Sequence, residues 1–359
     1  DAADPELGRR ILGRRMARAI FFASAPGAVA PTAVRGVEKG EVFLGTALPE
    51  EGLSLLEGGL KALNERLYYL YVSEGRYWFD TRPSLNRMAL DLAARIPDHE
   101  AEEEILKVVR EWGQSRKNSP FQAISYGPEG PEAVPDAPQF HLVVIPPSRG
   151  FVGRGPYKSV PLSDSPALRL AKAIYLNRAS GGLAPRQYPG GLFFLLPLEK
   201  HRAHTFHLAK TALAWERLRD EGKGERSPAD QRMVEERADT ERKAFRRAVM
   251  DLYVYVGRVV PVEGKPLGLH EEEALTLEEV FLATNGNPNQ IERAGNKVRG
   301  TWLDTYLPEE EILGRVLPRL KGPEDRLPVE EVWRDFFRYP SARMPADPGV
   351  VLSAIEALV

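Results

Sequence analysis

Three histidines, His201, His204 and His207, lie close enough together to form a candidate metal site. Imidazole nitrogens are common ligands of zinc and other transition metals. On a helix, residues three apart are separated by about 60° around the axis and residues six apart by about 120°. The three rings therefore cannot converge on one ion, although two of them with a carboxylate could serve a metal-dependent hydrolase. A histidine-rich helix packed on a sheet is the alternative, and we assign no metal.

A second candidate is the segment from Arg178 to Tyr188, in which Arg178 and Arg186 flank the glycine pair 181–182. Guanidinium groups bind phosphate and carboxylate through paired hydrogen bonds. The segment directly precedes an apolar run at 191–196, so we predict an anion-binding loop at the edge of a sheet. A loop that only braces that edge is the alternative.

A third candidate is an arginine-rich helix predicted over residues 5–23. Its apolar side chains recur at helical spacing, and basic residues cover much of the remaining surface. The basic face is either solvated or contacts phosphate, from DNA or from a bound nucleotide. The arginines of this face are Arg9, Arg10, Arg14, Arg15 and Arg18.

Motifs for nucleotide binding and covalent catalysis are absent from the sequence. No lysine lies in the Gly-x-x-x-x-Gly-Lys-Ser/Thr context of a P-loop, and the glycines of 149–155 open no helix. The chain has no cysteine, which excludes disulfides and thiolate chemistry. We therefore expect this chain to catalyse nothing by itself and to hold no cofactor of its own.

The composition is that of a globular protein with two or three domains. Its 359 residues are 43% hydrophobic and 28% charged, with a net charge of −2. That charge excludes a generally basic coat for nucleic acid. No apolar run approaches the roughly 20 residues of a membrane helix, so we expect a cytoplasmic protein without membrane contact. Abundant arginine and glutamate with 30 prolines suit a heat-adapted source, and both ends resemble cuts from a longer chain.

The firmest structural prediction is a β-hairpin with arms at 67–72 and 76–81. Aromatic and β-branched residues crowd both arms, and Gly75 suits the positive φ of a tight turn. A helix over 52–67 precedes the hairpin, residues 35–48 are a short helix or a strand, and Ser84 would cap a helix that packs back on this module. Helices followed by a two-stranded wing predict a winged-helix module.

The wing would offer contacts to a phosphate backbone or a minor groove. The predicted contacts are Arg76, Tyr77, Trp78, Arg82 and Arg87. The candidate recognition helix opposes this role, because Glu51, Glu57 and Glu65 offset Lys61 and Arg66 there. A winged helix that contacts protein is equally compatible with the sequence.

The rest of the chain is predicted to be mixed α/β and then helical. Strands at 121–126, 140–145 and 191–196 alternate with helices at 101–112, 165–177 and 199–220, which predicts an α/β layer with a small, mostly parallel sheet. After a charged linker at 221–227, the chain reads as helical to its end. We therefore divide it into 1–97 (lid remnant plus winged helix), 98–220 (α/β domain) and 221–359 (helical region).

Several short blocks resemble a known family. They are RYWFDTRPSLNR at 76–87, HLVVI at 141–145, APRQY at 184–188, GLFFLLPL at 191–198 and LAW at 213–215. In this order they resemble the C-terminal half of large AAA+ ATPases from prokaryotic anti-phage defence islands, which are related to BREX-type ATPases. Several relatives carry Arg-Asn where this chain has residues 188–190.

The resemblance implies that the P-loop, with its ATP and Mg, lies upstream in a missing N-terminal ATPase half. It also implies that an arginine of the lid senses nucleotide, with Arg9, Arg10, Arg14 and Arg15 in the right region. We expect the chain to couple nucleotide state to DNA or to a protein partner, including other defence proteins. The alternative is a protein–protein scaffold that holds an oligomer together without touching nucleic acid.

Overall fold

The computed structural model describes residues 11–29, 36–49, 51–73, 75–80, 84–114, 119–154, 162–181, 184–221, 226, 228–262, 274–319, 326–339 and 343–357. The chain forms two compact units. The first comprises residues 1–97 and 210–242, and the second comprises 98–209 and 243–359. Among the described residues, no helix has the length and apolar character needed to cross a membrane.

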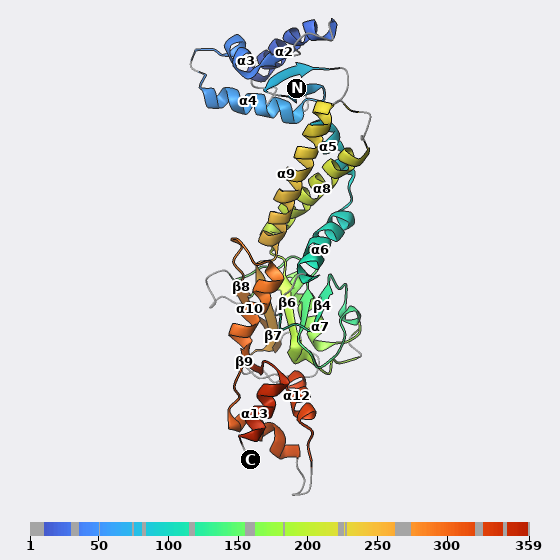
Figure 1. Ribbon diagram of the computed structural model, residues 1–359, viewed down its shortest axis with the longest axis vertical. Coiled ribbons are helices and arrows are strands. Elements are labelled where there is room, and N and C mark those ends of the chain that lie inside the picture. The colour runs from blue at the N-terminus through green and yellow to red at the C-terminus, as the bar shows by residue number, and fades with distance from the viewer. Residues whose placement is uncertain are drawn as a thin grey trace. The chain divides into compact units, whose positions relative to one another are not determined.

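The first unit begins with a module of three helices and three short strands (Figure 1). Its elements are α2 (Ile11–Val29), β1 (Val37–Glu38), α3 (Lys39–Thr46), α4 (Leu53–Arg66), β2 (Leu70–Ser73) and β3 (Arg76–Phe79). The strands form an antiparallel sheet in the order β1-β3-β2. The predicted hairpin is confirmed, with shorter arms than expected.

The module is built around a small apolar core and two glycine turns. Leu12, Met16 and Ile20 on α2 pack against the buried leucines of α4. Gly75 turns the hairpin with φ of 76°, and Gly36 precedes β1 with φ of 78°. A Cβ at Gly36 would lie 2.5 Å from the carbonyl oxygen of Tyr77, so only glycine fits there. Helix α2 continues to Val29, past the end predicted at residues 24–27.

Helix α5 (Leu85–Arg95) starts at Ser84, whose hydroxyl accepts a hydrogen bond from the Arg87 amide as the sequence predicted. Its buried face does not join the module core. Leu85 and Ala89 pack instead against Trp215 and Leu218 of α8 (Glu199–Glu221) and against α9 (Pro228–Leu252). Helix α5 packs back on the hairpin module near its start, where the Arg87 guanidinium lies over the Tyr68 ring, whereas its apolar stripe is covered by residues distant in sequence.

The second unit contains a five-stranded mixed sheet. Its strands are β4 (Ala123–Tyr126), β5 (His141–Val144), β6 (Leu192–Leu196), β7 (Tyr255–Pro261) and β8 (Leu275–Phe281), in that order across the sheet. The three predicted strands are confirmed and mutually parallel, whereas β7 and β8 pair antiparallel. The prediction of a helical region over 221–359 and of a mostly parallel sheet is wrong at these two strands.

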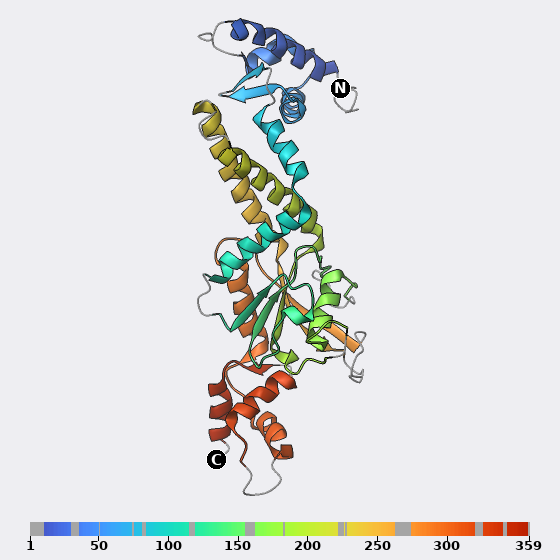
Figure 2. The ribbon, with the colours of Figure 1, turned by 90° about the vertical axis from the view of Figure 1, so that its right-hand side faces the viewer.

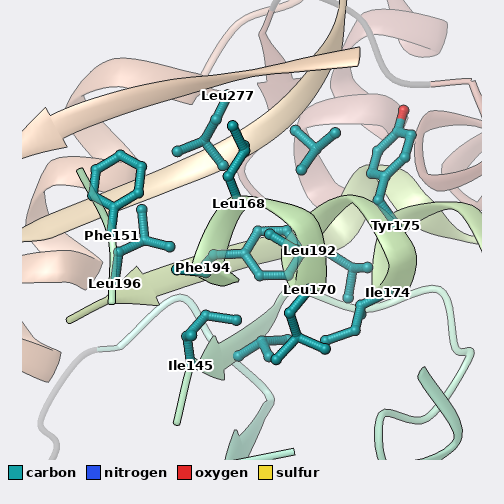
Figure 3. Packing of buried hydrophobic residues seen from close by; sticks show 14 of the residues in the cluster. Ile145, Phe151, Leu168, Leu170, Ile174, Tyr175, Leu192, Phe194, Leu196 and Leu277 are labelled. Atoms are coloured by element: carbon teal, nitrogen blue, oxygen red, sulfur yellow. The ribbon is translucent and has the colours of Figure 1, made fainter. Parts of the chain in front are cut away.

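Helices cover both faces of this sheet (Figure 2). Helix α7 (Pro166–Leu176), which Ser165 caps, covers one face and buries Phe194 and Leu277 (Figure 3). Helices α6 (Asp98–Gln114) and α10 (Gln290–Trp302) cover the other, where Phe193 meets the indole of Trp302 at 5.7 Å. Because neighbouring residues of a strand point to opposite faces, 192–196 can be apolar throughout.

The remaining elements are short and lie mostly near the C-terminus. They are the 3₁₀ turns 131–133, 189–191 and 317–319, the paired strands β9 (Leu303–Asp304) and β10 (Met344–Pro345), and the helices α11 (Glu309–Val316), α12 (Val329–Arg338) and α13 (Pro348–Glu356). Phe337 of α12 packs on Phe140 with ring centroids 5.2 Å apart. The C-terminal helices thus share the aromatic core of the second unit.

Candidate functional site

The outward face of α2 combines exposed apolar and cationic side chains. Ile11, Arg14, Arg18, Phe21 and Phe22 fall within an arc of about 100° around the helix, opposite the buried Leu12–Ile20 stripe. Ile11 and Phe22 are each 74% exposed. Neither Arg14 nor Arg18 has an ion-pair partner within the described residues. We call these five residues the α2 outer face.

The arginines predicted to sense nucleotide have different surroundings. Arg15 binds the carboxylate of Glu51 through Nη2, with distances of 2.5 and 2.7 Å to the two oxygens. This contact lowers the pKa of Glu51, helped by the Leu48 amide. Arg9 and Arg10 lie outside the described residues. Of the four, only Arg14 is described and without a partner.

Most residues predicted to contact DNA from the wing are used within the module. Arg76 donates to the Glu38 carboxylate and to the Gly36 carbonyl, both at 2.7 Å. Tyr77 packs against the core, and burial raises its pKa. Trp78 stacks on Tyr71 at 5.7 Å between ring centroids. These contacts stabilise the hairpin and leave little of the wing for a phosphate backbone.

Arg87 is likewise neutralised. Its guanidinium lies 3.8 Å from the centroid of the Tyr68 ring, donates to the Tyr68 hydroxyl and pairs with Asp91 at 2.9 Å. Arg82 lies outside the described residues. The structure therefore provides no free cation among the described members of the predicted DNA-contact set.

Charges on the exposed side of α4 cancel. Glu57 accepts a hydrogen bond from Lys39, and Lys61 lies 3.9 Å from Glu65. A helix that enters a groove needs cations toward the phosphates. Apolar side chains are instead exposed nearby, with Leu44 of α3 88% exposed and Leu53 63% exposed. This surface is better suited to a protein partner than to DNA.

The predicted anion loop is an internal clamp. The side chain of Arg186 is fully buried and donates to the carbonyl oxygens of Pro131, Val134, Pro135 and Ile174 at 2.7–3.3 Å. Burial lowers its pKa, and the Asp136 carboxylate 4.0 Å away opposes that shift. Arg178 is exposed on the other side of the turn. The two arginines do not converge, and the bracing interpretation describes Arg186 better.

A serine–histidine contact lies on the face of the sheet that α7 covers. His141 Nε2 is 2.9 Å from the hydroxyl of Ser125, on the adjacent parallel strand. Burial and the nearby charge of Arg186 lower the pKa of His141 to about 4. Within the described residues its Nδ1 has no hydrogen-bond partner, so no carboxylate completes a triad. A base of such low pKa binds a proton weakly at neutral pH.

The histidines of α8 do not form a metal site in the described part of the chain. His204 and His207 are exposed, and His201 is half-buried with its pKa lowered by burial. No group of three or more histidine, aspartate or glutamate side chains is arranged to hold an ion among the described residues.

The sequence analysis missed a hollow beside α10. Its lining includes Arg293, Lys297 and Thr301, which recur at helical spacing on the outward face of that helix. The signal was the alternation of these polar residues with the buried Ile291, Ala294 and Val298.

Comparison of the chain with models of known protein families, with curated proteins and with solved structures finds no match. The geometry described above is therefore what bears on function.

Proposed function

We propose that this chain is the non-catalytic part of an AAA+ type ATPase and that its N-terminal module contacts protein rather than DNA. In this proposal the module is a winged helix. The order α2-β1-α3-α4-β2-β3 and the sheet order β1-β3-β2 support that assignment, because both are the winged-helix order. The chain's work would be to hold copies of the parent ATPase together and to pass on nucleotide state.

The observation that carries the protein-contact proposal is the α2 outer face. This face carries exposed aromatic and aliphatic side chains at its two ends and, between them, two arginines without an ion-pair partner among the described residues. Side chains of these types are enriched at protein interfaces. The partner surface would present carboxylates flanked by apolar groups. An isolated exposed apolar residue would need no such explanation.

The DNA-reading version of the proposal has weaker support. Arg76 and Arg87, which would contact phosphates, are paired with Glu38 and Asp91. Breaking such pairs to bind a backbone would sacrifice part of the binding energy. ATP and Mg bound by the missing ATPase half, and contact with other defence proteins, follow from the family resemblance alone and are proposed on that basis.

Sedimentation velocity over a range of concentrations tests the assembly role. We expect the wild-type chain to self-associate and Ile11→Ser/Phe22→Ser to weaken the association constant at least about tenfold, because the substitution removes apolar area from the interface. Arg14→Glu/Arg18→Glu should act similarly. Leu352→Ser, at a 44% exposed position of α13, is the matched control and should associate like the wild type. A wild-type chain that stays monomeric at every concentration would contradict the proposal.

A further inference from the structure

An open hollow of about 440 Å³ lies between α10 and the loop that follows β8. Helix α10 contributes Arg293, Asn296, Lys297, Gly300 and Thr301 to its lining, and the loop contributes Leu282, Ala283 and Pro288. Every lining residue belongs to the second unit, in which β8 and α10 are marked in Figure 1. Its volume is in the range of small-molecule sites.

The positive charge of the lining is not neutralised. No carboxylate lines the hollow, and Lys297 is exposed without an ion-pair partner among the described residues. An ammonium in this position supplies up to three hydrogen-bond donors to an anion. The hollow is therefore electrostatically suited to an anionic ligand.

Arg293 adds a cation that the protein itself holds in place. Its Nε donates to the Pro288 carbonyl at 2.6 Å, and its Nη2 donates to the carbonyls of Asn285 and Gly286 at 2.7 and 2.8 Å. Its Nη1 has no hydrogen bond within the described part of the chain. A guanidinium anchored in this way loses little conformational entropy when it binds an anion.

The remaining lining groups narrow the ligand class. The Asn296 amide and the Thr301 hydroxyl add donors at the same helix face, and a phosphate has enough acceptor oxygens to engage several donors at once. Ala283 and Pro288, with the buried Leu282 behind them, form an apolar wall of the hollow. The geometry points to a binding site for a small organic phosphate, with the phosphate at Lys297 and Arg293 and the organic group on the apolar wall.

Gly300 provides a way to close the site without disturbing the fold. A Cβ built at Gly300 meets no atom within 4 Å, so the position faces open space. Gly314 of α11 is equally open. Leucine is a better helix former than glycine at an interior helical position, so Gly300→Leu should fill the hollow while keeping the helix folded. Gly314→Leu makes the same chemical change away from the hollow.

The test is calorimetric titration of the full chain with phenyl phosphate and with inorganic phosphate. We expect phenyl phosphate to bind, and to bind at least about fivefold more tightly than inorganic phosphate because of the apolar wall. Lys297→Gln should weaken phenyl phosphate binding at least about tenfold, and Gly300→Leu should abolish it. The controls Lys200→Gln, an exposed lysine of α8, and Gly314→Leu should bind like the wild type. Thermal melting of each variant checks that it is folded.

Failure to bind phenyl phosphate would overturn the proposal, and so would binding that survives in folded Gly300→Leu. Equal affinity for inorganic phosphate and phenyl phosphate would overturn the role of the apolar wall. A parallel titration with adenosine monophosphate separates two sources of the ligand, since tighter binding than phenyl phosphate identifies a nucleotide and weaker binding identifies another organic phosphate.

Discussion

The loop that contains Arg186 and the outer face of α2 use arginine in opposite ways. The Arg186 side chain is fully buried, and its guanidinium donates hydrogen bonds to carbonyl oxygens of its own unit. Arg14 and Arg18 are exposed and lack partners in the described part of the chain. The comparison teaches that an arginine beside a glycine turn is no sign of a binding loop until its donors are accounted for. The donors of Arg186 already form hydrogen bonds within the folded unit, whereas those of Arg14 and Arg18 remain available to a partner.

The largest effect expected from this contrast is on stability. Arg186→Met would leave the carbonyl oxygens of Val134, Pro135 and Ile174 without the Arg186 donor, and buried unsatisfied acceptors are costly. We expect a loss in the free energy of unfolding on the order of 3 to 5 kcal/mol, measured by urea denaturation. Arg14→Met is the matched control and should change stability by no more than about 0.5 kcal/mol. Equally small changes in the free energy of unfolding for Arg186→Met and Arg14→Met would contradict a stabilising role of Arg186.

A somewhat smaller effect is expected on the pH dependence of the free energy of unfolding, through His141 in the same buried region. The pKa of His141 is about 4 in the folded chain, against an ordinary histidine pKa of 6.5. Between these values only the unfolded chain binds the proton, so the stabilisation present above pH 6.5 is lost as the pH falls to 4. The difference amounts to about 3 kcal/mol. Urea denaturation at pH 7 and pH 4.5 should show most of this loss in the wild type.

His141→Gln is the variant that isolates this dependence. Glutamine retains a polar partner for Ser125 but does not titrate, so the loss between pH 7 and pH 4.5 should shrink by most of that amount. The charge of Arg186 helps to lower the pKa of His141. Arg186→Met should therefore also reduce the loss in the free energy of unfolding between pH 7 and pH 4.5. An unchanged pH dependence in His141→Gln would show that other groups are responsible.

Local signals in the sequence predicted much of the fold. The N-cap at Ser84, the turn at Gly75 and the strands predicted at 140–145 and 191–196 depend on neighbouring residues, and each was found as expected. Strands β7 and β8 were missed because their register is set by pairing with distant β6 and with each other. The surroundings of the candidate site residues were harder to predict from the sequence than the strands. The carboxylates that neutralise Arg76 and Arg87, and the carbonyls that bind Arg186, are brought to them only by folding.

The central claim is that the N-terminal module contacts protein and not DNA. Fluorescence anisotropy with a short labelled duplex, between about 50 and 200 mM salt, tests it most directly. Wild type would be compared with Arg76→Ala and with Arg14→Ala/Arg18→Ala. We expect no more than weak binding of the duplex, equal in all three chains. Micromolar binding that falls steeply with salt, and falls further in either variant, would contradict it.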